Sequence, residues 1–330
     1  MREAGRLDKD AGVTSRLSPE AIGEYLVERR VFHDTAELEV VELSGGVSAD
    51  VFAVRGEGKR VVLKQALPRF RVADEWLVPT DRAVTEAKAL RLMAELMPES
   101  VPELVDSDPD ASALVVAEAP PLWRSWKSHM LEGDADPAVA SRLGELLALL
   151  HGSTTDIELG SVESLEAQRI DPYFHTIQRR HPEIADEIEV YLEQLLSTQR
   201  CVVHGDYSPK NILVGDAGLW VIDWEVAHRG DPAFDIAFML NHLLLKTIHR
   251  PEARPDYEAC GEAFVNAYAL PVDLPYVLGL VGCLMLARVD GKSPAEYLTE
   301  PERERARAHG IALLTNPPAS LAEAWSRIAR

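Results

Sequence analysis

Residues 201–235 constrain the fold and the chemistry of this chain more than any other part of the sequence. An apolar run leads into a polar loop that contains Asp206, and Asn211 follows five residues later. Two apolar runs within residues 212–222, separated by Gly-Asp-Ala-Gly, predict a β-hairpin that ends at Asp223. Because the hairpin returns the chain to its starting point, we expect Asn211 at its base to lie beside Asp223.

These three oxygen-bearing side chains suit the transfer of a phosphoryl group. A carboxylate near a substrate hydroxyl accepts its proton, and an amide oxygen with a second carboxylate holds Mg²⁺ on nucleotide phosphates. The alternative is that Asp206, Asn211 and Asp216 only shape turns, since Asp and Asn favour turns. For a single residue that alternative is the stronger one, but the ordered set at this spacing favours chemistry.

The motifs HGDYSPKNIL, VIDWE and GDPAFDIA resemble the catalytic core of the aminoglycoside phosphotransferase family. Its superfamily includes choline, homoserine, fructosamine and methylthioribose kinases, which share a protein-kinase-like fold of two lobes. The resemblance implies ATP and Mg²⁺ as cofactors, Asp206 as the catalytic base, and Asn211 and Asp223 as metal ligands. It also implies that Asp235 braces the catalytic loop.

Upstream, alternating apolar residues at 38–43, 50–55 and 60–65 predict three antiparallel strands. The first connection contains Gly45, Gly46 and Ser48, small residues that let backbone N–H groups approach a phosphate. These three are therefore candidates for nucleotide binding, although Gly-Gly between strands by itself often only turns the chain.

Lys64 ends the third apolar strand, where a charged group needs an anionic partner. The helix predicted after Thr80-Asp81 carries Glu86 beside its apolar stripe. In the kinase-like fold a strand lysine pairs with a glutamate of the next helix and contacts the nucleotide. The resemblance thus assigns Lys64 and Glu86 to cofactor binding; the alternative is two solvated surface side chains.

The stretch QALPRFRVADEWLVPTDRAVTEA is similar to the corresponding part of methylthioribose kinases. This similarity makes Trp76 a candidate substrate contact, while a purely structural tryptophan is an equal alternative. Glu225 and Arg229, just after the metal aspartate, are further candidate substrate contacts. Glu118 opens a Pro-rich connector, which we expect to form the hinge whose backbone binds adenine.

The expected fold class is α+β, with two lobes. Residues 1–118 would form the nucleotide-binding lobe, an antiparallel sheet plus helix, preceded by a mobile tail at 1–16. Residues 119–330 would form a mostly helical catalytic and substrate-binding lobe. The helices are expected near residue 18, at 139–150 and within 160–198, and further along at 234–245, 256–269, 275–289 and 301–313.

The acceptor is expected to be a small molecule. Gly205 stands where protein kinases carry an arginine before the catalytic aspartate, and only about a dozen residues separate Asp223 from Asp235, which leaves no room for an activation loop. Methylthioribose kinases usually carry serine at the position of Asn211, and Pro-Glu where this chain has Trp224-Glu225. The acceptor therefore stays open among sugars, aminoglycoside-like alcohols, methylthioribose, homoserine and choline. A catalytically silent nucleotide-binding regulator is the alternative function.

The net charge limits the classes of partner that the protein could bind, and the cysteine content bears on its location. The chain has 34 Lys and Arg against 54 Asp and Glu, a net charge of −20, which argues against nucleic acid and acidic membranes as partners. The charge either favours a cationic substrate or only keeps the protein soluble. Three isolated cysteines among apolar residues, no apolar N-terminal segment and no long apolar run predict a cytoplasmic protein. Monomer and homodimer both remain open.

Overall fold

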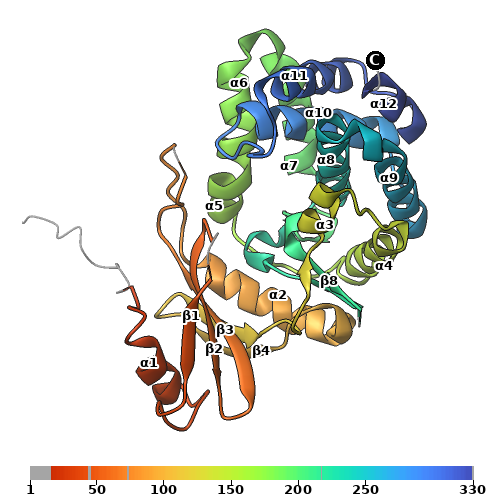
Figure 1. The fold of residues 1–330 in the computed structure, drawn as a ribbon. Helices are drawn as coiled ribbons and strands as arrows, with labels where there is room; N and C mark the ends of the chain where they lie inside the picture. Colours follow the sequence, from red (N-terminus) through yellow and green to blue (C-terminus); the bar gives the residue numbers. More distant parts are fainter. Residues whose placement is uncertain (1–15, 44–45, 73, 217, 329–330) are drawn as a thin grey trace, which may run out of the picture.

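The computed structural model describes residues 16–43, 46–72, 74–216 and 218–328, so the predicted tail lies outside it except for Arg16. The N-terminal part contains a five-stranded antiparallel sheet with the order β1-β2-β3-β5-β4 (Figure 1). The three strands predicted first are confirmed to within one residue at each end, whereas β4 was not predicted because its polar residues do not alternate with apolar ones. The strands are β1 (Glu39–Glu42), β2 (Ala49–Gly56), β3 (Lys59–Ala66), β4 (Leu104–Asp108) and β5 (Ala113–Ala117).

The inner strands of this sheet are buried on both faces, and β5 shows how its sequence achieves this. Successive side chains of a strand point to opposite faces. Ala113 and Val115 accordingly join a small core under α1 (Ile22–Glu28). Leu114 and Val116 belong to the main core, with residues of α2 (Arg82–Leu96). The expected helix near residue 18 thus begins at Ile22 and covers the outer face of the sheet.

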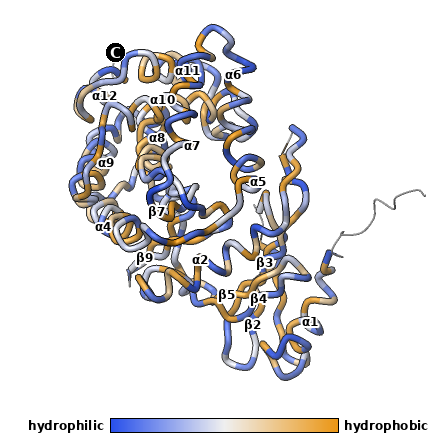
Figure 2. The backbone as a smooth tube through the Cα atoms, turned by 180° about the vertical axis from the view of Figure 1, so that it is seen from behind, coloured by the Kyte–Doolittle hydropathy of each residue, from blue (hydrophilic) through white to orange (hydrophobic). Residues whose placement is uncertain are grey.

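The C-terminal part is mostly helical, as predicted, and the predicted helices lie within a few residues of the observed ones. Its centre is α8, in which every residue from 233 to 248 is buried. Figure 2 shows hydrophobic stretches along α8 and its neighbour α10. The longer helices are α3 (Trp126–Glu132), α4 (Pro137–Ser153), α7 (Ala185–Ser197), α8 (Ala233–His249), α9 (Arg254–Tyr268), α10 (Leu274–Asp290), α11 (Glu300–Thr315) and α12 (Leu321–Ile328).

Between α4 and α7 the chain forms the short helices α5 (Val162–Leu165) and α6 (Thr176–Arg180), joined by a π-helical segment at Glu166–His175. Such wide turns are rare and often occur at functional sites. This segment places Arg169 and Tyr173 on the wall of the cavity described below.

The connection between the two parts runs from the end of β5 through a Pro-rich segment to β6 (Arg124–Ser125) and α3. The division into lobes at residues 118 and 119 stays a prediction. The predicted hairpin is confirmed as β8 (Ile212–Gly215) and β9 (Gly218–Val221), with β6 paired to its outer edge. A separate pair, β7 (Cys201–Val203) and β10 (His228–Gly230), flanks the polar loop.

All three cysteines are buried free thiols, as predicted. Burial raises the pKa of Cys201 and that of Cys260 to about 12. In the part of the chain that the structure describes, no helix has both the length and the apolar character needed to cross a membrane.

Candidate active site

A cavity of 850 Å³ lies between the sheet and the helical part. Arg229 does not line it, and Gly45 lies outside the described residues. Ten of the residues predicted from the sequence line this cavity: Gly46, Ser48, Lys64, Trp76, Glu86, Glu118, Asp206, Asn211, Asp223 and Glu225.

Lys64 is the centre of a charged cluster at the end of β3. Its Nζ donates to Glu86 Oε1 at 2.6 Å and Oε2 at 2.8 Å, and to Asp223 Oδ1 at 2.7 Å. Burial opposes the charge of Lys64, but the carboxylates around it hold its pKa above the ordinary value. The structure therefore brings Lys64 and Glu86 into contact, as expected, and adds Asp223 as a second carboxylate partner.

The polar loop before Asp206 is held by Asp235 in the first turn of α8. Asp235 Oδ2 accepts a hydrogen bond from the His204 backbone N–H at 2.7 Å, and Oδ1 accepts one from Gly205 N–H at 2.9 Å. Gly205 has a φ of +76°, and a Cβ there would lie 2.7 Å from the carbonyl oxygen of Val226. Only glycine fits this turn, so the loop geometry depends on both Gly205 and Asp235.

His204 fixes the same loop from within. Its Nε2 donates to the carbonyl of Ile222 at 3.1 Å, and its Nδ1 accepts from the Asp206 backbone N–H at 3.2 Å. Burial lowers the pKa of His204 despite the nearby Asp235 and Asp206 charges. The neutral ring is thus used on both nitrogens, which makes His204 a structural brace.

Asp206 lies between two cations that the sequence did not single out. Its Oδ2 is 3.0 Å from Arg169 Nη2 and 2.9 Å from Lys210 Nζ, and Oδ1 accepts from Ser208 Oγ at 3.1 Å. Burial alone would raise the pKa of Asp206, but the charges of Lys210 and Arg169 outweigh it and lower the pKa. Lys210 could have been found as the basic residue inside HGDYSPKN, whereas Arg169 comes from the distant π-helical segment.

The oxygens suited to a divalent cation converge next to Lys64. Asn211 Nδ2 donates to the Asp206 carbonyl at 3.0 Å, which leaves the amide oxygen of Asn211 for a cation. Carboxylate oxygens of Glu86, Asp223 and Glu225 lie within 4.8 Å of one another. Carboxylate and amide oxygens are the ligands that Mg²⁺ prefers in proteins. This donor set fits the predicted metal site and adds Glu86 and Glu225 to its surroundings.

Glu225, a predicted substrate contact, is held by Arg82 at the start of α2. Arg82 Nε donates to Glu225 Oε2 at 3.0 Å, and both side chains are almost completely buried. The other guanidinium nitrogens bind backbone carbonyls of the N-terminal part: Ser48, Leu67 and Pro79. Arg82 therefore links the loop near the predicted phosphate contacts to the segment after Asp223. Sequence reasoning missed this arginine.

Gly46 and Ser48 lie at the cavity edge near the start of β2. Glu118 lies at the end of β5, where its carboxylate pairs with Arg55 at 2.5 Å and Arg60 at 3.1 Å. The Glu118 backbone N–H donates to the Arg60 carbonyl at 3.1 Å. Since this donor is used inside the sheet, an adenine contact from Glu118 is left to its carbonyl oxygen.

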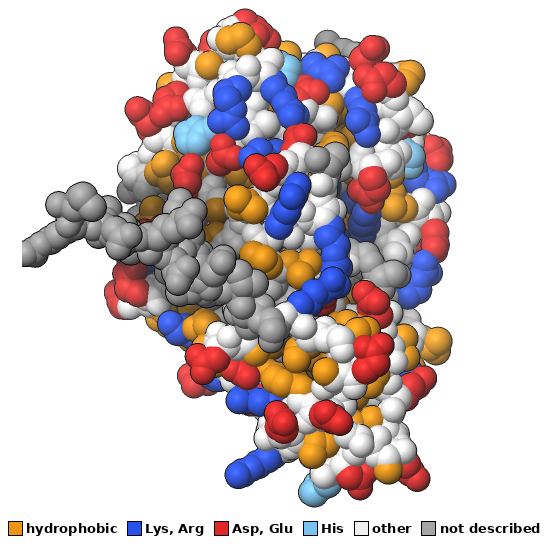
Figure 3. Space-filling model, turned by 90° about the vertical axis from the view of Figure 1, so that its left-hand side faces the viewer, with side chains coloured by type: hydrophobic (Ala, Val, Ile, Leu, Met, Phe, Trp, Pro, Cys, Tyr) orange, Lys and Arg blue, Asp and Glu red, His pale blue; other side chains and the backbone are white. Residues whose placement is uncertain are grey.

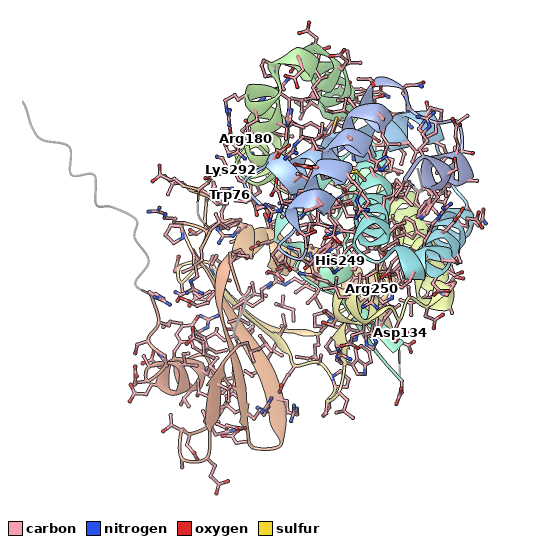
Figure 4. The ribbon with its side chains drawn as sticks, turned by 45° about the horizontal axis from the view of Figure 1, so that its top comes forward. Trp76, Asp134, Arg180, His249, Arg250 and Lys292 are labelled. Atoms are coloured by element: carbon pink, nitrogen blue, oxygen red, sulfur yellow. The ribbon has the colours of Figure 1, made fainter. Side chains whose placement is uncertain are left out.

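Trp76 closes one side of the cavity. Its indole Nε1 donates to the Ala167 carbonyl at 2.7 Å, and its ring lies 4.8 Å from that of Phe70. Figure 4 shows Trp76 close to Arg180 and Lys292, where its loop meets the helical part. Arg180 also pairs with Asp74 of this loop at 3.1 Å. Trp76 thus packs the loop down and lines the cavity at the same time.

Arg229 lies away from these residues. Its guanidinium Nη1 donates to the carbonyls of Thr155 at 2.6 Å and Ile157 at 3.3 Å, and Nε is 3.3 Å from Glu158. The structure therefore places Arg229 with the segment after α4 and does not bring it to the other predicted substrate contacts.

Residues 39–269 match the model of a family described as phosphotransferase enzyme family. The chain is 28% identical over 229 residues to methylthioribose kinase of Geobacillus sp. (strain WCH70), an alignment that covers 60% of this chain and 57% of that protein. It is 27% identical over 260 residues to methylthioribose kinase of Bacillus cereus (strain AH820), covering 69% and 66%. The chain thus spans less than two thirds of the length of these two relatives.

Two solved structures share the fold of this chain at low identity. Amicoumacin kinase hAmiN in complex with AMP-PNP, Ca2+ and Ami superposes with a TM-score of 0.60 and 14% identity, covering 92% of this chain and 98% of that one. The microcompartment-associated aminopropanol kinase superposes with a TM-score of 0.54 and 14% identity, covering 86% and 95%. The predicted kinase-like fold, with an antiparallel sheet followed by a helical part, is confirmed.

Proposed function

Because this chain belongs to the phosphotransferase enzyme family, we propose that it transfers the γ-phosphoryl group of ATP to a hydroxyl group of a small molecule. The observation that carries the proposal is the meeting of four side chains in one cavity. Lys64, the loop with Asp206 and Asn211, and Asp223 belong to three separate segments, and these side chains converge there with Glu86. This set supplies a base, metal ligands and a phosphate-binding cation, which are the groups that phosphoryl transfer requires.

Asp206 is the proposed base. It orients the acceptor hydroxyl and takes its proton as the oxygen attacks the γ-phosphorus and the bond to the β-phosphate oxygen breaks. Its lowered pKa keeps the carboxylate ionised, and a loose transition state needs positioning more than a strong base. Lys64 binds nucleotide phosphate oxygens, and Glu86 holds the ammonium in place.

Magnesium is the proposed metal, with Asn211 and Asp223 as ligands and Glu225 beside them. When bound, the ion neutralises charge on the phosphates. The presence of AMP-PNP and Ca2+ in the structure of amicoumacin kinase hAmiN supports a nucleotide and a divalent cation in this fold. Gly46, Ser48 and the carbonyl of Glu118 are proposed nucleotide contacts, and Trp76 a proposed acceptor contact.

The acceptor is a sugar or an aminoglycoside-like alcohol in this proposal, with methylthioribose, homoserine and choline as members of the same set. The methylthioribose kinases among the relatives support a sugar. The buried, unpaired cysteine thiols support the proposed cytoplasmic location.

The proposal is tested by measuring ATP consumption by the purified protein with Mg²⁺. The acceptor panel contains methylthioribose, several aminoglycosides, choline, homoserine and simple sugars, with a reaction without acceptor as the control. Turnover well above that control with one compound is the expected result. If the protein binds no ATP, the proposal is wrong. ATP binding without turnover on any acceptor would favour the regulatory alternative.

A further inference from the structure

The cavity wall beyond Asp206 carries more positive than negative charge. Lys127 from α3, Arg169 from the π-helical segment and Lys210 from the catalytic loop all line it. Arg169 and Lys210 share Asp206 as their carboxylate partner. Lys127 contacts Glu296, whose side chain is 63% exposed.

Behind this wall, Lys246 of α8 is a completely buried lysine with no hydrogen-bond partner among the described residues. Its Nζ lies 5.5 Å from the ring centroid of Tyr297, and Lys127 Nζ lies 5.9 Å from the same centroid. Burial and the charges of Lys127 and Arg288 lower the pKa of Lys246 to about 7. A buried ammonium without an anion is costly, and an anion bound nearby would favour the charged form of Lys246.

Arg288, near the end of α10, extends the same group. Its Nη1 donates to Ser293 Oγ at 2.6 Å, and Ser293 lines the cavity. The Nε of Arg288 and the hydroxyl of Tyr297 have no hydrogen-bond partner among the described residues. Three buried polar groups behind this wall, including Lys246, thus have unused hydrogen-bonding capacity.

The charges of this group do not balance. Two carboxylates, Asp206 and Glu296, form ion pairs with it. The nearby His242 adds no negative charge, and its pKa is held well below the ordinary value by burial and by the surrounding cations. Against the two carboxylates stand four cationic side chains: Lys127, Arg169, Lys210 and Arg288. Lys246 is a fifth basic group, whose charged form an anion nearby would favour.

We propose that the acceptor carries an oxyanion, either a carboxylate or a phosphate, in addition to the hydroxyl that is phosphorylated. Its binding place is the wall formed by Lys127 and Ser293, with Lys246 and Arg288 behind it. Ammonium, guanidinium and hydroxyl donors suit oxyanions, and such charge-assisted hydrogen bonds are stronger than neutral ones. This inference rests on the proposed kinase function and narrows its substrate class. It also rejects a purely cationic acceptor.

The test uses sulfate as the oxyanion probe. The full-length protein is first saturated with AMP-PNP and Mg²⁺, so that the position of the γ-phosphate is occupied. Sulfate binding to this complex is then measured by calorimetry and thermal shift, against sodium chloride at equal ionic strength. We expect saturable binding of sulfate. If sulfate stabilises the complex no more than chloride does, the inference is overturned, while AMP-PNP binding separately reports on the proposed function.

Two variants locate the probe. Lys127→Met removes a cation that lines the cavity and should weaken sulfate binding by about tenfold to a hundredfold, the effect of one lost charge-assisted hydrogen bond. Lys246→Met removes a charge behind the wall and should weaken sulfate binding by a smaller factor. AMP-PNP binding should be unchanged. The matched control is Lys88→Met on the exposed side of α2, which should bind sulfate like the wild type. Sulfate affinity unchanged in both test variants would contradict the assignment. A loss of folding in one variant leaves the other to decide.

A matched set of small alcohols then distinguishes the two kinds of oxyanion. Glycerol, glycerate and glycerol 3-phosphate share a three-carbon frame and differ in charge, and their binding to the AMP-PNP complex is compared by calorimetry. At least tenfold tighter binding of glycerate identifies a carboxylate as the recognised group, and the same result with glycerol 3-phosphate identifies a phosphate. Equal binding of all three would contradict the inference.

Discussion

The two ends of the cavity differ in whether their charged side chains have partners within the protein. At the nucleotide end, Lys64 contacts Glu86 and Asp223, and Arg82 contacts Glu225. At the proposed acceptor end, Lys246 Nζ has no hydrogen-bond partner among the described residues. At the first end both cations have carboxylate partners within the protein. At the second end, hydrogen-bonding capacity stays unused behind the cavity wall, which bears on what could bind there.

The overall charge of the chain predicts nothing about this difference. A net charge of −20 suggested a cationic substrate as one possibility, yet the acceptor end is locally positive. On the face drawn in Figure 3, basic side chains run across the middle while acidic ones lie mainly around them. Local charge is set by which side chains the fold brings together, and the sum over the sequence does not contain that information.

The largest expected effect concerns the residue between the two ends. Asp206→Asn should lower kcat by about 10²- to 10⁴-fold, the usual contribution of a general base. Nucleotide binding should stay nearly intact, because Lys64, Asn211 and Asp223 are unchanged. Steady-state kinetics and AMP-PNP calorimetry measure the two effects. Asp216→Asn, in the exposed hairpin turn, is the control. An unchanged kcat in Asp206→Asn would contradict the assignment of Asp206 as the general base.

Removing a cation from the proposed nucleotide end should destabilise the protein. Arg82→Ala leaves Glu225 buried without its partner, and breaking such a buried pair costs about 3–5 kcal/mol. Urea unfolding measures this change. Arg91→Ala, an exposed position on the same helix, should change the free energy of unfolding by less than about 0.5 kcal/mol. Equal changes in the free energy of unfolding for the two substitutions would show that the ion pair between Arg82 and Glu225 does not stabilise the protein.

Substituting Asp235, which holds the loop before Asp206, should have a smaller effect on stability. Asp235→Asn loses charge-assisted hydrogen bonds to two backbone N–H groups and should cost about 2–3 kcal/mol. Burial opposes ionisation of Asp235, but the His151 contact and the loop amides lower its pKa below the ordinary 3.8. Its stabilisation is therefore present above pH 3.8 and is lost as the pH falls through the folded-state pKa. Acid unfolding at a higher pH in the variant than in the wild type is the expected observation.

The smallest expected effect is on the pH dependence of stability, and it concerns Lys246 at the proposed acceptor end. Lys246 has a pKa of about 7 in the folded protein, against 10.5 as its ordinary value. Between these values the unfolded chain binds more protons, so this group makes stability rise with pH by at most about 1.4 kcal/mol per unit. In Lys246→Met that contribution is absent. Urea unfolding of both proteins at pH 7, 8 and 9 should show a flatter profile for the variant; parallel profiles would mean that Lys246 is charged and paired.

Local sequence predicted the parts of this molecule that depend on local geometry. The alternation in β1, β2 and β3, the hairpin that brings Asn211 near Asp223, and the loop around Gly205 all follow from residues close in the chain. Lys64, at the end of an apolar strand, needs an anionic partner, and the resemblance to the kinase-like fold named Glu86 as that partner. These contacts put the predicted catalytic residues into one cavity.

The missed residues depend on packing between distant segments. Arg169 comes from an irregular π-helical turn, and Arg82 joins α2 to the segment after Asp223. Lys246 lies in a helix whose other residues are almost all apolar, and no neighbour in the sequence shows that it stays unpaired. Such positions become visible only when the tertiary structure supplies their surroundings.

The proposal that one end of the cavity binds the nucleotide and the other binds an oxyanion is tested most directly with one pair of variants and two ligands. Lys64→Met and Lys127→Met are each titrated with AMP-PNP and Mg²⁺, and then with sulfate at saturating nucleotide. The account predicts that Lys64→Met weakens nucleotide binding and leaves sulfate binding unchanged. Lys127→Met should weaken sulfate binding and leave nucleotide binding unchanged. If both substitutions weaken the same ligand, the two ends do not act separately and the account is wrong.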